Sequence, residues 1–178
     1  MDVIRNRSVV SDTWRHELSL PVDKATAELA PGDVIVCLQR WLSDWEALLA
    51  RGARVGVRID GGDDLRQLID TQLSELWLVE FHFESFADGR AYSRARLLRA
   101  RYDFHGDIRA AGDVSRDRLG FMERCGFNVF NLPAQADLAE ALAAFSEIGD
   151  TYQPAADGDA SVARLRGYRT RPAVRSAA

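Results

Sequence analysis

Two short segments of the chain combine a glycine, an acid and an arginine in a pattern that suits anion binding. The first is Asp88-Gly89-Arg90, with Arg94 one helical turn further on, and the second runs from Gly112-Asp113 to Arg116-Asp117. Each segment opens a predicted helix, where unpaired backbone N–H groups can meet a negative charge. The candidate anion-binding residues are therefore Asp88, Gly89, Arg90, Arg94, Gly112, Asp113, Arg116 and Asp117.

Both segments also have a purely structural interpretation. Asp88 can cap the first helix while Arg90 pairs with Asp88 or with Glu84. Asp113 or Ser115 can cap the second helix in the same way. The residues alone leave both interpretations open.

The remaining titratable residues give weaker signals. Paired carboxylates for acid–base work or for a metal are available, but their spacing matches no known ligand pattern; these residues are Asp60, Glu80, Glu84 and Asp113. His82 alternates with phenylalanines on a predicted strand, which indicates a structural role, and His16 and His105 have no visible partners. We therefore predict no metal site.

The sequence indicates no redox group or nucleotide site. The two cysteines, Cys37 and Cys125, have the spacing of neither a zinc site nor a disulfide framework. The chain contains no Gly-x-Gly-x-x-Gly segment and no Walker-type loop, so no nicotinamide, flavin or nucleotide cofactor is indicated. The identity of any cofactor stays open.

The length, charge and arginine content of the chain indicate what kind of protein it is. The chain has 178 residues, which suits a single domain, and its net charge of −4 does not favour nucleic acid or an anionic membrane surface as a partner. Arginine supplies 22 of the 23 basic residues, so planar guanidinium groups that can bind an anion through two N–H donors occur throughout the chain. No signal-peptide core and no membrane-spanning run is visible, and we expect a cytoplasmic protein.

Alternating strands and helices predict an α/β fold with repeated βαβ units. About five strands are expected, in a mainly parallel, Rossmann-like or half-barrel-like sheet, at 34–38, 54–59, 76–83, 107–111 and 128–132. Helices are expected at 42–51, 64–73, from the Asp88 loop to about residue 102, and at 116–125 and 136–148. The C-terminal ends of the strands then share one edge, where ligands usually bind in such sheets.

The two ends of the chain are predicted to differ from this pattern. Within residues 1–20 we expect a small β-hairpin, turning at Asn6, followed by an extended segment whose residues 12–14 lie on the surface. The single α/β domain then covers residues 1–150. Residues 151–178 carry five arginines and little periodicity, and are predicted to form a flexible tail.

Several joined motifs resemble a known bacterial family. They read FADGRAYS at 86–93, ARLLR at 95–99, RAAGDV at 109–114, RD at 116–117 and RCGF at 124–127. In this order they resemble the domain-of-unknown-function family 934, which is described as an oxidoreductase involved in sulfite reduction. The resemblance covers most of the chain except the tail.

The resemblance implies a role in assimilatory sulfite or sulfate reduction, and two mechanisms are open. In one, the protein is an accessory or partner of the sulfite reductase system. In the other, it is an enzyme that binds a small oxyanion or a phosphorylated ligand in an arginine-lined site at the C-terminal edge of the sheet.

Overall fold

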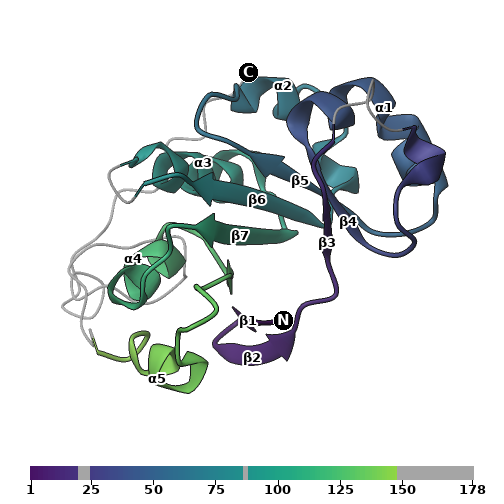
Figure 1. Ribbon diagram of the computed structural model, residues 1–178. Coiled ribbons are helices and arrows are strands. Elements are labelled where there is room, and N and C mark those ends of the chain that lie inside the picture. The colour runs from purple at the N-terminus through teal and green to yellow at the C-terminus, as the bar shows by residue number, and fades with distance from the viewer. Residues whose placement is uncertain (20–24, 86–87, 148–178) are drawn as a thin grey trace.

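The computed structural model describes residues 1–19, 25–85 and 88–147 (Figure 1). It is an α/β structure with one eight-stranded sheet in the order β2-β1-β8-β7-β6-β5-β4-β3. The strands are β1 (Asp2–Arg5), β2 (Ser8–Ser11), β3 (Arg15–Glu17), β4 (Val34–Cys37), β5 (Val55–Ile59), β6 (Leu78–Phe83), β7 (Asp107–Gly112) and β8 (Val129–Phe130). The helices are α1 (Leu38–Ala50), α2 (Leu65–Ile69), α3 (Arg90–Tyr102), α4 (Leu119–Arg124) and α5 (Leu138–Ala143), with short 3₁₀ turns η1 (Thr26–Glu28), η2 (Leu73–Glu75) and η3 (Arg116–Arg118). The predicted tail, residues 151–178, lies outside the described residues.

The sheet is mainly parallel. Strands β3 to β8 run parallel and lie next to one another in chain order. The hairpin of β1 and β2 completes the sheet, because β1 pairs antiparallel with β8. The predicted parallel sheet and N-terminal hairpin are confirmed, but the predicted count of about five strands is wrong. The sheet reaches eight strands because the hairpin joins it and because β3 adds an edge strand.

The strand order also distinguishes the two predicted architectures. A Rossmann-like sheet reverses its strand order, so that helices cover both faces. Here the order of β3 to β8 follows the chain without reversal, and right-handed crossovers then pass over one face only. Figure 1 shows α1 to α4 following the outside of the strands. The fold is therefore a curled half-barrel.

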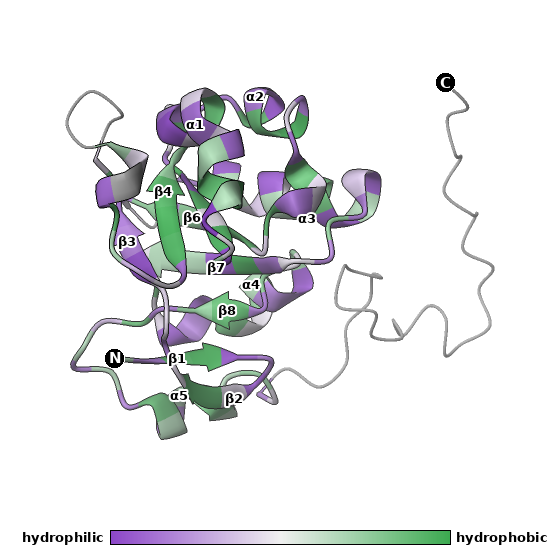
Figure 2. Cartoon of the chain, turned by 90° about the vertical axis from the view of Figure 1, so that its right-hand side faces the viewer, coloured by the Kyte–Doolittle hydropathy of each residue, from purple (hydrophilic) through white to green (hydrophobic). Residues whose placement is uncertain are grey.

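The two faces of the sheet differ in composition because side chains alternate along each strand. Under the helices, the outer face is apolar and buried, with Val34, Val36, Val55, Val57, Ile59, Val79, Phe81, Phe83, Ile108, Ala110 and Phe130. Burial of one such aliphatic or aromatic side chain contributes about 1.5–3 kcal/mol. The inner face carries the alternate residues, which include Arg58, Glu80 and Arg109. In Figure 2 the strands β4 and β8 are hydrophobic, whereas β3 is hydrophilic.

Residues 12–14 cross the open side of the half-barrel. β2 and β3 are the opposite edges of the sheet, yet only these residues connect them. The connection spans at most about 14 Å, whereas the edges of a flat eight-stranded sheet would lie roughly 34 Å apart. The sheet must therefore curl until its edges approach each other. We term residues 12–14 the strap.

Most predicted helices are present with shifted ends. The helix α3 is as predicted, and α1 begins directly after β4, earlier than predicted. The predicted helix at 64–73 is divided into α2 and η2, and Asp64 caps α2 by accepting from the backbone N–H of Arg66 at 3.0 Å. The side chain of the preceding residue, Asp63, accepts from the backbone N–H of Asp60 at 2.8 Å and so closes the loop after β5. The last two predicted helices correspond to η3 with α4 and to α5.

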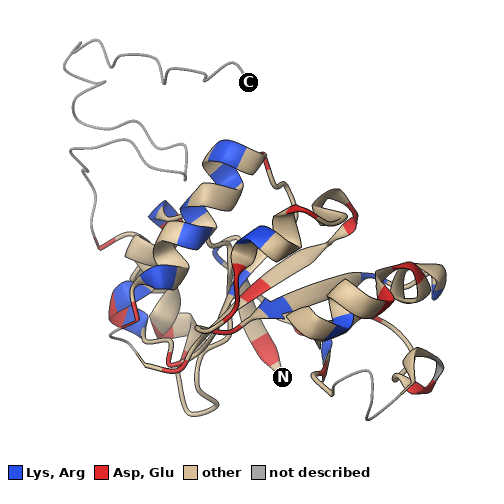
Figure 3. Ribbon diagram, turned by 90° about the horizontal axis from the view of Figure 1, so that it is seen from above, with Lys and Arg blue, Asp and Glu red and all other residues tan. Residues whose placement is uncertain are grey.

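Charged residues of both signs occur on the helices and in the loops (Figure 3). Their mixture agrees with the small net charge of the chain, −4. Among the described residues, every helix is too short or too polar to pass through a lipid bilayer.

Candidate functional site

The loops after β5, β6 and β7 meet at the C-terminal edge of the sheet. The N–H of Asp113 donates to the carbonyl of Phe83 at 2.8 Å, which holds the loop after β7 against the end of β6. The guanidinium of Arg94 donates to the carbonyls of Asp60, at 3.3 Å, and Asp63, at 2.7 Å. These bonds tie α3 to the loop after β5. Both predicted segments therefore lie at one edge, which we term the rim.

Asp88 and Arg90 form a closed pair at the start of α3. Nε of Arg90 donates to Oδ1 of Asp88 at 2.9 Å and Nη2 donates to Oδ2 at 2.7 Å. The backbone N–H of Arg90 also donates to Oδ1, at 3.0 Å. The bonds from Arg90 lower the pKa of Asp88 to about 2. Asp88 thus caps the helix and pairs with Arg90, as the structural interpretation of this segment expects, and the Arg90 side chain remains 61% exposed.

Two glycines near this pair have different roles. Gly61 packs against it, because an added Cβ would lie 2.8 Å from Nη2 of Arg90 and 3.1 Å from Oδ2 of Asp88. Gly89 has ordinary helical angles, φ −77° and ψ −6°, and no atom lies within 4 Å of the position of a Cβ there. Gly61, on the loop after β5, therefore lies directly against the Asp88–Arg90 pair, whereas Gly89 does not.

Gly112 is the rim position that requires a glycine. Its φ is +88°, and an added Cβ would lie 2.4 Å from the carbonyl oxygen of Phe83. This close approach allows the N–H of Asp113 to reach that carbonyl. Arg118 then lies over the loop, with Nη2 at 3.6 Å from Oδ1 of Asp113.

Arg116 is held on the α5 side of the rim. Its Nη2 forms an ion pair with Glu147, and its Nε lies 3.8 Å from Oε1 of Glu140. The hydrogen bond to Glu147 raises the pKa of Arg116, and a hydrogen bond with Ser115 lowers the pKa of Asp117. The residues of the first predicted segment therefore gather at the start of α3, whereas Arg116 is directed towards α5.

A second group of polar side chains lies on the inner face of the sheet. Glu80 and Arg109 are in register on β6 and β7, with Nε of Arg109 at 3.2 Å from Oε2 of Glu80, and they are 0% and 1% exposed. Nη2 of Arg109 also donates to Oδ2 of Asp12, at 2.7 Å. For Asp12 the predicted surface position is wrong: its side chain is only 8% exposed, because the strap crosses the concave side of the sheet.

His16 joins this group from β3, three strands away from β6. Its Nε2 lies 3.0 Å from both carboxylate oxygens of Glu80. In a flat sheet these two strands would be roughly 14 Å apart, so the contact depends on the curl. We term His16, Glu80, Arg109 and Asp12 the inner cluster.

Sequence reasoning missed the inner cluster, although the sequence contains one signal for it. Glu80 and Arg109 each stand in the middle of an otherwise apolar strand. A charge in such a position must find a partner, because burying it alone is costly. The partner His16 was not recognisable, since 64 residues separate it from Glu80.

Two further titratable candidates, Asp60 and His105, pair with oppositely charged neighbours. Oδ1 of Asp60 accepts from Nε of Arg58 at 2.8 Å. His105 lies 3.3 Å from Asp103, and both side chains are largely exposed. In the described ranges, no group of three or more His, Cys, Asp or Glu is placed to hold a metal ion.

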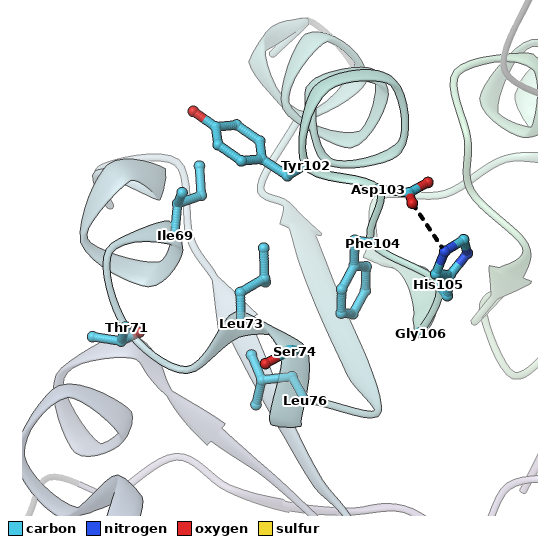
Figure 4. Close-up of a pocket in the computed structure, with 10 residues that line it drawn as sticks. All are labelled: Ile69, Thr71, Leu73, Ser74, Leu76, Tyr102, Asp103, Phe104, His105 and Gly106. Atoms are coloured by element: carbon cyan, nitrogen blue, oxygen red, sulfur yellow. Dashed lines mark ion pairs between the residues drawn. The ribbon is translucent and has the colours of Figure 1, made fainter. Parts of the chain in front are cut away.

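A cavity of about 400 Å³ opens at the opposite, N-terminal edge of the strands (Figure 4). Its apolar lining is formed by Ile69, Leu73, Leu76 and Phe104. Figure 4 shows Tyr102 on one side of it and the Asp103–His105 pair on the other. A smaller hollow shares His105 with this cavity and includes Trp77, which is 59% exposed. Large apolar surface thus lies next to a concave region.

A family model matches residues 56–163 of the chain and is described as a bacterial protein of unknown function, DUF934. The matched range contains β5 to α5 and both rim segments. No curated protein matches the chain. The family description names no reaction, so the function has to be argued from the geometry.

Proposed function

The chain belongs to the bacterial family of unknown function DUF934, and we propose that it takes part in assimilatory sulfite or sulfate reduction. Its contribution in this proposal is to bind a small oxyanion or a phosphorylated ligand at the rim. The connection with sulfur rests on the resemblance carried by the FADGRAYS and RAAGDV motifs. The ligand class rests on the chemistry of the rim.

The guanidinium of Arg90 is the observation that carries the ligand class. Asp88 engages Nε and one edge of Nη2, and the remaining N–H groups belong to a side chain that is 61% exposed. Arg90 stands at the N-terminus of the 13-residue α3, where the helix dipole favours an anion. Arg94 adds a positive charge one turn further on, in a position fixed by the carbonyls of the loop after β5.

This geometry suits recognition and orientation of a ligand. A planar guanidinium binds sulfite, sulfate or phosphate through paired N–H···O bonds, and an exposed helix N-terminus adds backbone donors. Asp88 keeps the Arg90 side chain in place before a ligand arrives, which lowers the entropy that binding must overcome. An anion bound here would accept hydrogen bonds from the N–H groups of Arg90 that do not donate to Asp88.

Calorimetry with sulfite, sulfate, phosphate and FMN tests this proposal. We expect at least one of them to bind, and Arg90→Ala to weaken that binding about tenfold or more, as loss of a charge-assisted hydrogen bond does. Arg116→Ala is the matched control, since that guanidinium is occupied by Glu147 and should affect binding little. Equal losses in both variants, or no binding of any of the four compounds, would contradict the proposal.

A partner role is the second candidate, and the exposed apolar surface at the N-terminal edge favours it. Trp77 and Tyr102 are exposed beside the cavity of about 400 Å³. Tryptophan and tyrosine are the side chains that most often anchor protein interfaces. In this alternative the protein is an accessory of the sulfite reductase system and binds it through this surface.

Co-purification with sulfite reductase tests the partner role. Trp77→Ser should abolish co-purification if this surface is the interface. Phe121→Ser is the matched control, because Phe121 is similarly exposed, at 56%, but lies on α4. Co-purification that survives Trp77→Ser, or that is absent in the unaltered protein, would remove this candidate.

A further inference from the structure

The inner cluster places charges where apolar side chains would fill the space equally well. Glu80 and Arg109 are almost wholly buried, and Asp12 nearly so. Replacing a buried ion pair by apolar residues of similar volume is often neutral or stabilising. Packing alone therefore does not account for these charges. Arg109 contacts both carboxylates, and of these three residues Glu80 alone also contacts His16.

His16 is held through one ring nitrogen and is open at the other. Nε2 lies 3.0 Å from both oxygens of the buried Glu80 carboxylate, and in the tautomer with its proton on Nε2 the ring donates to Glu80. Nδ1 then carries the lone pair, and it has no hydrogen-bond partner within the part of the chain that the structure describes. The side chain is 35% exposed, so a ligand can reach it. A carboxylate behind an imidazole is the arrangement that orients a general base.

Arg58 places a cation next to Glu80, the carboxylate that holds this imidazole. On β5 it is in register with Glu80, so their side chains are neighbours on the inner face. Its Nε is engaged by Asp60 at 2.8 Å, and its side chain is 19% exposed. The group that holds His16 is therefore flanked by a guanidinium that a small anion can approach.

Three buried polar atoms on the same face have no hydrogen-bond partner among the described residues: Nε and Nη1 of Arg109 and Oδ1 of Asn131. Arg109 on β7 is in register with Val129 on β8. Asn131 follows Val129 by two residues, so it lies on the same, inner face of the sheet. A buried donor or acceptor without a partner costs about 1–3 kcal/mol. The inner face therefore offers polar atoms that a small polar molecule could bind.

We infer that the inner face carries a second site, at which Nδ1 of His16 accepts a proton from a small oxyacid and Arg58 pairs with the anion that is formed. The O–H bond of the oxyacid breaks, its proton becomes the Nδ1–H of an imidazolium, and the electron pair stays on the ligand oxygen. Glu80 balances the charge of the imidazolium. Glu80 is a positioning residue, as are Arg109 and Asp12, which hold it through their ion pairs.

This site goes beyond the proposed function, because it adds proton transfer to the recognition of an anion and does not use Asp88, Arg90 or Arg94. The two sites lie on different parts of the sheet: the rim is built from the loops after β5, β6 and β7, whereas the inner cluster lies within β3, β6, β7 and the strap. An experiment can therefore disprove one of the two sites without disproving the other.

The histidine signals of the full chain provide the test. The chain has three histidines, so labelling them with ¹⁵N gives three imidazoles to follow by NMR during titrations with sulfite and phosphate at neutral pH. We expect the Nδ1 signal of His16 to move saturably towards its protonated value with at least one of these probes, at concentrations that leave His105 unchanged. His105 is the internal control, because it is exposed and paired only with Asp103.

Variants of the arginines separate this site from a structural role. Arg58→Gln should weaken the response of His16 about tenfold and Arg58→Lys less, whereas Arg66→Gln, on the exposed side of α2, should not change it. Arg90→Ala, which disables the rim, should also leave the His16 response intact. Loss of the response in Arg90→Ala would reduce the two sites to one and overturn the inference. So would a His16 that fails to respond to every probe, or that responds only in parallel with His105.

Discussion

The rim and the inner cluster use the same chemical pair, arginine with a carboxylate, in opposite ways. At the rim, Arg90 and Asp88 are two residues apart, and their side chains are 61% and 25% exposed. On the inner face, Arg109 is 97 residues from Asp12 and both are buried. The local pair shapes a loop and leaves donors for a ligand. The distant pair joins the strap to the sheet and so maintains the curl.

The comparison is tested most strongly by removing one arginine from each region. Arg109→Ala leaves Glu80 and Asp12 buried without their cation, and we expect the free energy of unfolding to fall by about 3–5 kcal/mol. Arg90→Ala removes an exposed partner, so we expect little change in stability. Urea unfolding of both variants gives the two values. Similar losses in both would show that burial does not distinguish the regions.

Alanine substitutions of two rim glycines should have a smaller effect on the free energy of unfolding, and the two substitutions should differ. Gly112→Ala forces a side chain into φ +88° and against the carbonyl of Phe83, so we expect a loss of about 1–3 kcal/mol. Gly89→Ala, at an ordinary helical conformation with free space around it, should be neutral or slightly stabilising. Thermal unfolding measures both. A tolerated Gly112→Ala would mean that the loop after β7 can leave the end of β6.

The smallest expected effect concerns the pH dependence of the rim. Arg90 lowers the pKa of Asp88 to about 2, so the pair stabilises the folded state above the ordinary carboxyl pKa and loses that contribution as the pH falls from roughly 4 to 2. The exposure of the pair keeps this contribution small. Carboxyl carbon NMR should show the Asp88 midpoint near 2, and a higher midpoint in Arg90→Ala. An unchanged midpoint in the variant would show that Arg90 does not hold Asp88 in solution.

The strands of the fold could be predicted from sequence where burial dictates their composition. The apolar runs of β4 to β8 fill the outer face, and the apolar pairs at 3–4 and 9–10, on either side of a turn at Asn6, mark the hairpin. The strand β3 could not be predicted, because Arg-His-Glu carries no apolar pattern and is fixed by pairing with β4 and by the bond from His16 to Glu80. The half-barrel was one of the two expected architectures, but the crossing of its open side by the strap depends on β3 and was missed.

In the candidate site, too, contacts between sequence neighbours could be predicted and contacts between distant residues could not. The geometry around Asp88 and Arg90 depends on neighbours in sequence and was among the expected alternatives. The direction of Arg116 depends on Glu140 and Glu147, which come 24 and 31 residues later. The inner cluster needs four elements brought together by the curl, and single-residue patterns carry no information about that curl.

A single titration followed through the arginine side chains tests the account most directly. The protein labelled with ¹⁵N-arginine is titrated with sulfite, and the Nε–H signals are followed by NMR. The account predicts that Arg90 and Arg94 respond together, that Arg58 responds together with His16, and that Arg116 does not respond. Equal responses of Arg116 and Arg90, or no response of any of these arginines, would contradict it.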